Sequence, residues 1–136
     1  MAFTGNFTCN VFKTGLLNAD FDFATDTIKI ALYTNSATLD ASTTEYTTTG
    51  EVVATGYTAG GNTLTPTVSI SNGVAFVTFA NTSWSGAFTA RGALIYKAGA
   101  NGAICVLDFG SDKTSAATFQ VQFPPATSTS AIIRIS

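Results

Sequence analysis

Three carboxylates within seven residues form the densest group of side chains that could do chemistry. Asp20 and Asp22 alternate with Phe21 and Phe23, and Asp26 follows. Clustered carboxylates bind hard cations, but a helix–loop–helix calcium site also needs a glycine at its turn and a final glutamate, and this spacing lacks both. The alternation predicts an extended stretch with Asp20 and Asp22 on its solvated face, where charge discourages pairing with another strand.

Two other short motifs match known sites only in part. Residues 108–110 read Asp-Phe-Gly, the letters of the kinase magnesium motif, but no glycine-rich phosphate loop or catalytic loop accompanies them. Residues 60–62, Gly-Gly-Asn, precede no predicted helix that could hold a phosphate. We expect Asp108, and Asp112 beside Lys113, to be turn residues with local hydrogen bonds.

The chain contains no histidine, which excludes a His-dependent triad, a His-ligated metal and a His proton switch. Glycoside cleavage needs two acids across a cleft, and the sequence does not place any two of its eight Asp and Glu residues in that way. We therefore expect no catalytic residue, no metal and no cofactor, and we interpret the chain as a protein without enzymatic activity.

Charged residues make up only 10% of the 136 positions, whereas Thr supplies 24 and Ser 11. The net charge of −2 with six basic side chains argues against a nucleic-acid partner. No apolar run approaches a membrane span, and no signal-peptide pattern is present. Cys9 and Cys105 are expected to be buried reduced thiols. Removing water from a hydroxyl-rich surface costs less free energy than removing it from a charged one, and such a surface lacks charge repulsion. Both properties favour assembly with a partner.

Period-two alternation of apolar residues dominates the pattern and predicts strands. Asn72-Gly73 predicts a tight hairpin turn, because these residues tolerate positive φ, and residues 98–102 predict a longer hairpin loop. Pro124 and Pro125 end the strand before them. The predicted strands are 27–33, 51–54, 68–70, 74–79, 82–84, 92–97, 103–109, 119–123 and 131–135.

One helix is predicted, from Asn10 through Ala19, with Asn10 as its cap. Its Phe12, Leu16 and Leu17 should contact the core. Residues 35–62 form a long excursion rich in Thr, Ser and Gly, and such loops are often functional. We predict a single all-β domain over 1–136, an antiparallel β-sandwich for which a jelly roll is one topology, with 1–9 as an N-terminal arm.

The aromatic residues allow two interpretations. Phe3 and Phe7 lie outside any predicted strand, so they either clasp a neighbouring subunit or fold back onto their own core. A second group could stack on sugars, although filling the core or a protein interface is the more common role of such residues; this group is Tyr33, Tyr46, Tyr57 and Trp84.

Five blocks of strand and turn sequence follow one another along nearly the whole chain: 29–34 (KIALYT), 56–61 (GYTAGG), 90–96 (ARGALIY), 103–115 (AICVLDFGSDKTS) and 131–135 (AIIRI). Together they resemble a small family of tailed-bacteriophage virion structural proteins. The resemblance implies a structural subunit and identifies no active site.

Small β-sandwich proteins on phage heads commonly act as cement or decoration subunits, so the resemblance implies a protein made in the host cytoplasm and placed on the outer surface of the head. The implied partners are the major capsid protein and copies of the chain itself, as a dimer or trimer. We expect apolar anchors to carry the interface, and the candidates are Phe3, Phe7, Tyr57, Trp84 and Phe88.

Two other functions remain open on the sequence. The chain could be a head- or tail-fibre component that binds a host surface glycan, with Tyr57 and Trp84 around an exposed sugar groove. A glycan hydrolase that uses Asp20, Asp22 and Asp26 is the third alternative, and the missing histidine and unpaired acids favour it least.

Overall fold

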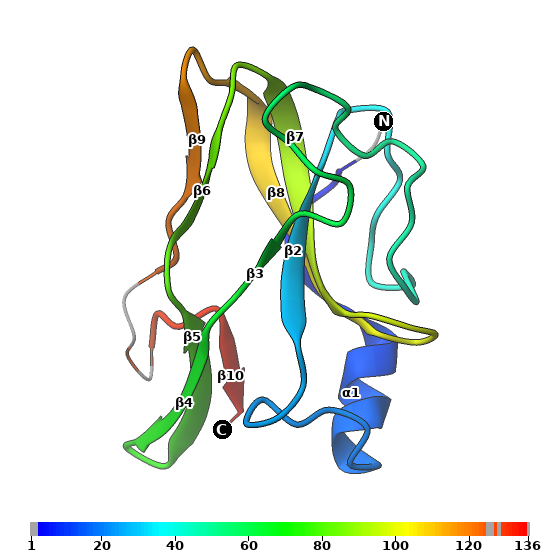
Figure 1. The fold of residues 1–136 in the computed structure, drawn as a ribbon. Helices are drawn as coiled ribbons and strands as arrows, with labels where there is room; N and C mark the ends of the chain where they lie inside the picture. Colours follow the sequence, from blue (N-terminus) through cyan, green and yellow to red (C-terminus); the bar gives the residue numbers. More distant parts are fainter. Residues whose placement is uncertain (1–2, 125–126, 128, 136) are drawn as a thin grey trace.

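The computed structural model describes residues 3–124, 127 and 129–135. Two layers of antiparallel strands face each other (Figure 1), which confirms the predicted all-β sandwich. The first layer is one sheet in the order β1 (Phe7–Thr8), β8 (Ala103–Thr114), β7 (Thr89–Lys97), β2 (Ile28–Tyr33) and β3 (Asn62–Thr63). The sequence did not decide between a jelly roll and other sandwich topologies. The strand order β1-β8-β7-β2-β3 is the one that the structure shows for this layer.

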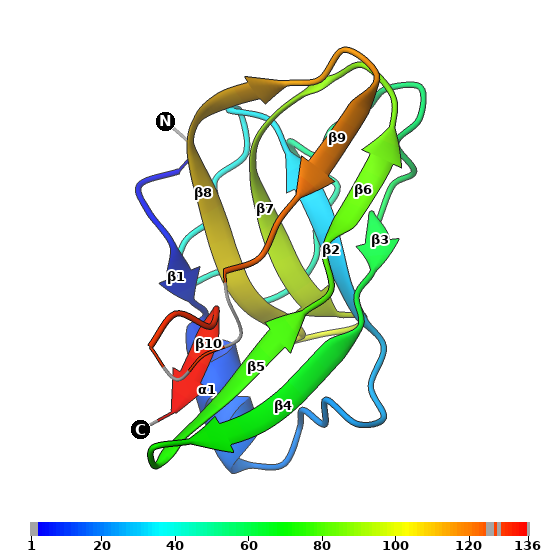
Figure 2. The same cartoon turned by 90° about the vertical axis from the view of Figure 1, so that its left-hand side faces the viewer.

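The second layer consists of two smaller sheets that lie across the first (Figure 2). One has the order β10 (Ile133–Ile135), β5 (Val74–Phe79) and β4 (Pro66–Ser71), and the other pairs β6 (Thr82–Ser85) with β9 (Thr118–Val121). The single described helix, α1 (Asn10–Leu17), lies at the end of the sandwich where β4, β5 and β10 are found.

Strand β2 is buried on both of its faces. Its period-two residues Ile28, Ile30 and Leu32 are at most 1% exposed, as the pattern predicts, but Ala31 and Tyr33 on the opposite face are also fully buried. The long excursion between β2 and β3 runs over this outer face of the sheet (Figure 1). Burial of both faces thus depends on a segment with almost no regular structure.

Both predicted hairpins are confirmed. Asn72 and Gly73 connect β4 to β5 with φ angles of 54° and 77°, the pair of positive values that a two-residue type I′ turn requires. Residues 98–102 connect β7 to β8, and Asn101 has a φ of 59° there.

Strand β8 extends well past its predicted end, through the Asp-Phe-Gly triplet to Thr114. The β7–β8 register shifts between Ala90 and Gly92, where β8 carries extra residues around Gly110, whose φ is 85°. Asp108 accepts the Gly110 N–H at 2.8 Å and pairs with Arg91 at 3.1 Å. These contacts, the Gly110 hydrogen bond first, hold the pKa of Asp108 below its ordinary value. The local hydrogen bond was predicted, but Asp108 lies in a strand rather than a turn.

The helix differs from its prediction at both ends. Cys9 is the N-cap and supplies no side-chain hydrogen bond, so Asn10 is the first helical residue and not the cap. The helix ends at Leu17, before Ala19 adopts a φ of 62°. Phe12 is 2% exposed as expected, whereas Leu17, the last residue of the helix, is 90% exposed and does not contact the core as predicted.

Residues 3–9 of the N-terminal segment pack against the chain's own sheet. Phe3 is 1% exposed, and its ring lies where a side chain at Gly92 would be. Phe7 and Thr8 form β1, which pairs with β8, and Cys9 is fully buried. The arm therefore folds back onto its own core, and residues 1–2 lie outside the described part of the chain.

Two glycines with the same backbone conformation provide a test of this packing. Gly61 and Gly73 have φ angles of 76° and 77°. A Cβ on Gly61 would lie 1.7 Å from the Ile30 carbonyl oxygen, whereas a Cβ on Gly73 would meet no atom within 4 Å. We expect Gly73→Ala to cost about 1 kcal/mol from backbone strain alone. Gly61→Ala should cost about 2–4 kcal/mol, since overpacking adds to the strain. Urea unfolding of both variants measures the difference, and equal costs would contradict the close approach at β3.

Candidate protein interface

Four of the five predicted interface residues lie inside the chain's own core. Phe3, Tyr57, Trp84 and Phe88 are between 1% and 8% exposed. The physical reason is mutual packing of aromatic rings from different elements: Tyr57 lies 6.0 Å from Trp84 and 5.9 Å from Phe88 between ring centroids. Phe88 in turn stacks on Phe119 of β9 at 5.2 Å. Phe3 packs separately, against Gly92 of β7. In this structure all four side chains are used within the chain's own core and are not available to a partner.

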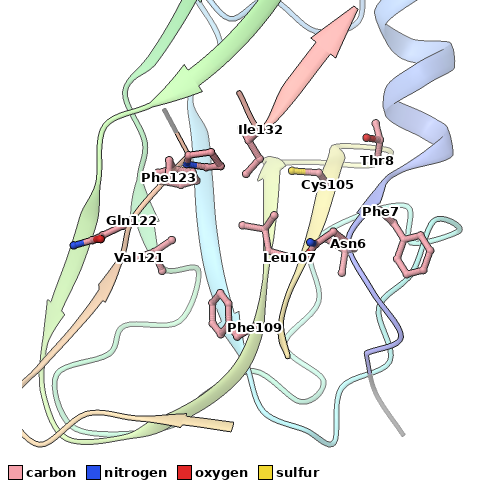
Figure 3. Close-up of a pocket in the computed structure, with 12 residues that line it drawn as sticks. Asn6, Phe7, Thr8, Cys105, Leu107, Phe109, Val121, Gln122, Phe123 and Ile132 are labelled. Atoms are coloured by element: carbon pink, nitrogen blue, oxygen red, sulfur yellow. The ribbon is translucent and has the colours of Figure 1, made fainter. Parts of the chain in front are cut away.

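Phe7 is the predicted interface residue that stays partly exposed. It borders a pocket of about 350 Å³ between β1 and β8 on one side and β9 and the segment before β10 on the other. Figure 3 shows Leu107, Val121 and Ile132 around this space, with Phe7 at its outer side. The lining is mostly apolar, so the pocket can take an apolar side chain but has no group arranged for chemistry.

Asp20 and Asp22 are exposed, as predicted, but Asp22 and Asp26 close a turn where an extended stretch was expected. Asp26 Oδ2 accepts the Asp22 N–H at 2.8 Å, and Asp22 Oδ1 accepts the Ala24 N–H at 2.9 Å. Asp26 also pairs with Lys97 at 3.3 Å. The Asp22 and Asp26 side chains are used in local hydrogen bonding. Nowhere in the described ranges do three or more His, Cys, Asp or Glu residues gather to hold a metal ion.

The buried carboxylate of Glu51 holds the long excursion between β2 and β3 against the sheet through hydrogen bonds. Glu51 is 6% exposed. Its Oε1 accepts the Tyr46 hydroxyl at 2.5 Å, and its Oε2 accepts the Tyr57 hydroxyl at 2.6 Å and the Gly60 N–H at 2.8 Å. The Tyr57 hydroxyl also accepts the Leu32 N–H of β2 at 2.9 Å. Both carboxylate oxygens are occupied by the protein's own donors, so this cluster is a tether and offers no open site.

All four tyrosines of the chain surround this tether or its neighbours. Burial, followed by the Glu51 hydrogen bonds, raises the pKa of Tyr46 and of Tyr57. Burial also raises the pKa of Tyr33, whose hydroxyl donates to the Thr47 carbonyl at 2.7 Å. Burial and the charge of Glu51 raise the pKa of Tyr96 to about 12. The sequence left open whether three of these rings stack on sugars or, the more common role, fill the core or an interface. In the structure their hydroxyls hold the long excursion in place.

The two cysteines are free and buried, as predicted. Burial raises the pKa of Cys9 to about 11 and also raises the pKa of Cys105. A thiol with a raised pKa is a poor nucleophile at neutral pH, so both act as small apolar core residues.

Of the five large apolar residues that are exposed in the described part of the chain, four gather instead at the helix end of the sandwich, and the fifth, Val53, is 96% exposed in the long excursion. Val68 is 59% exposed, Ile70 73%, Ile135 53% and Leu17 90%, and we call these four residues the apolar end. Val68 and Ile70 lie on β4, Ile135 on β10 and Leu17 on α1. A groove of about 120 Å³ with an almost wholly apolar lining runs between α1 and this sheet, from Phe12 and Phe23 to Val68 and Ile135.

Sequence reasoning missed the apolar end, although part of its signal was present. The run from Pro66 to Ser71 alternates Val68 and Ile70 with hydroxyl residues and has no charge, which looks like an ordinary half-buried strand. Its exposure arises because β4 is the last strand of its sheet, so no neighbouring strand lies along its outer edge. The exposure of Val68 and Ile70 can therefore be inferred only once the strand order is known.

Comparisons with protein-family models, with curated proteins and with solved structures find no match to this chain. No helix in the described residues is long and apolar enough to cross a membrane. The feature of the surface that bears most on function is the apolar end, on a chain with only 10% charged residues.

The Glu51 tether has a matched control in Glu45, which is exposed. Glu51→Ala leaves two hydroxyls and the Gly60 N–H without their acceptor, and we expect it to lower the free energy of unfolding by about 3 kcal/mol. Glu45→Ala should change it by less than about 0.5 kcal/mol. Chemical denaturation followed by tryptophan fluorescence measures both, and similar values for the two variants would refute the tether.

The tyrosine pKa shifts predict a loss of stability at high pH. A folded-state pKa above the ordinary value of 10.0 means that unfolded tyrosines ionise first, so stability present below pH ~10 is lost as pH rises toward ~12. We expect folded protein at pH about 11 to show far less tyrosinate absorbance than guanidinium-unfolded protein at the same pH. Four tyrosines that all titrate near pH 10 in the folded chain would contradict the buried hydroxyl network.

Proposed function

We propose that this chain is a structural subunit of a phage virion, acting as a cement or decoration protein that bridges major capsid proteins on the outside of the head. The observation that carries the proposal is the apolar end, where Leu17, Val68, Ile70 and Ile135 are more than half exposed. Exposed apolar patches on a soluble domain mark interaction surfaces. The resemblance of the five sequence blocks to virion structural proteins supplies the kind of assembly.

Low charge supports this role. Only 10% of the residues are charged, so burying the surface against a capsid requires little desolvation of ions. A subunit that contacts several capsid proteins gains effective concentration at its second and third contacts, so each contact can be weak. The shell is then held by many small interfaces that must all open before it ruptures.

The alternative of a glycan-binding fibre component loses its main support. It requires Tyr57 and Trp84 around an exposed groove, but these side chains are 8% and 4% exposed. The Tyr57 hydroxyl is already bonded to Glu51 and Leu32. The hydrolase alternative loses its geometry as well, because Asp22 and Asp26 are hydrogen-bonded within one turn.

A deletion phage tests the proposal. Virions that lack this chain should release their DNA at a lower temperature, or sooner under chelation, than complete virions, because fewer contacts hold the shell. A dye that fluoresces on free DNA follows the release. Adding purified wild-type chain to the deletion particles should restore resistance, and adding Leu17→Lys chain, altered at the apolar end, should restore less.

Three outcomes would contradict this function. Equal heat resistance with and without the chain would remove the cement role. Quantitative mass spectrometry that finds only a few copies per particle would favour a fibre component instead. Absence of the chain from purified particles would remove the virion assignment altogether.

A further inference from the structure

Strand β4 is an edge of its sheet that nothing in the described chain protects. The other edges are short or blocked: β1 and β3 have two residues each, and β10 has three, including Arg134. Strands β6 and β9 have four residues each, and the Asn62 side chain covers the Ser83 carbonyl of β6 at 2.9 Å. Strand β4 has six residues, no charge, and an unbroken register with β5. Proteins normally protect such an edge with charges, bulges or a covering segment.

The turn that begins the hairpin determines which backbone groups are free. In a two-residue type I′ hairpin, Ser71 and Val74 form a hydrogen-bonded pair, and so do Ser69 and Phe76 in the observed register. The N–H and C=O groups of Val68 and Ile70 therefore point away from β5. No described segment hydrogen-bonds to residues 67–71 from that side. The free edge thus offers two donors and two acceptors at the spacing that an extended strand requires.

We propose that this edge pairs antiparallel with β4 of a second copy, with Ser69 on a two-fold axis. Val68 of one copy then lies opposite Ile70 of the other, twice, and each pair exchanges both of its backbone hydrogen bonds. The sheets β10-β5-β4 of the two copies become one six-stranded sheet, three strands from each copy. The interface is isologous, as a closed two-fold dimer requires.

The side chains favour the chain's own copy as occupant. Val68 lies in one row with Val77 and Ile133, and Ile70 lies in one row with Ala75 and Ile135. Self-pairing continues these apolar rows into the second copy. It brings no like charges together, because residues 66–71 contain none. The apolar–Ser–apolar pattern around Ser69 reads the same in both directions, so the antiparallel copy presents matching side chains.

This inference does not depend on the capsid assignment, because it is tested on the purified chain alone. Sedimentation equilibrium up to about 1 mM should show a mass approaching twice 14.0 kDa. Val68→Lys combined with Ile70→Lys places like charges opposite each other twice, and should weaken the dimer at least about tenfold. Both positions are more than half exposed, so circular dichroism should show an unchanged fold.

The register has its own test. Val68→Lys combined with Ile70→Glu places Lys opposite Glu in both pairs, and should restore most of the dimer that the double-lysine variant loses. Leu17→Lys, at the same end of the molecule but on α1, is the matched control and should leave the dimer intact. A wild-type chain that stays monomeric throughout, a double-lysine variant that still dimerises, a Lys/Glu variant that does not recover, or a Leu17→Lys variant that is monomeric would overturn the proposal.

Discussion

The sandwich depends on one constraint: strand β2 must be covered on both faces, although only one face meets another sheet. The second cover is a segment of nearly thirty residues that lacks regular structure, which makes its ordering entropically costly. The Glu51 tether offsets that cost by binding two tyrosine hydroxyls and the Gly60 N–H at the middle of the segment. A buried carboxylate is tolerable only when its oxygens are satisfied, and here the same hydrogen bonds that satisfy it also position the loop.

Most strands and both hairpins were predictable because their signals are local. The two-residue strands β1 and β3 were not predicted, and the predicted strand at 51–54 is only an isolated bridge between Glu51 and Tyr33. Alternation locates β2, β5 and β9, and Asn72-Gly73 specifies a turn whose φ angles only such residues accept easily. Local sequence could not decide whether the side chains of Tyr33, Tyr57 and Trp84 are buried or exposed, because an aromatic residue has the same local pattern in a core as on a binding face. Their burial depends on contacts between residues far apart in sequence, such as Tyr57 with Leu32, and these require the strand order.

The same limit explains the acidic segment and the apolar end. Alternation of Asp and Phe predicted an extended stretch, but a carboxylate that accepts a backbone N–H two or four residues away competes with strand pairing, and Asp22 and Asp26 take part in such bonds. At β4 the alternation predicted the strand correctly. What it could not show is that this strand ends its sheet, so residues with an ordinary core pattern are left in solvent.

The two ends of the molecule differ in a way that connects stability to assembly. Both oxygens of Glu51 are hydrogen-bonded within the chain. At the apolar end, by contrast, the outer edge of β4 has no backbone partner among the described residues, and four apolar side chains are more than half exposed. Joining two copies at β4 pairs that backbone and brings two α1 grooves to the same joined sheet. A dimer built in this way would present its remaining apolar residues twice. Two weak contacts on such a rigid body would act together on a repeating lattice, as the proposed capsid-binding role requires.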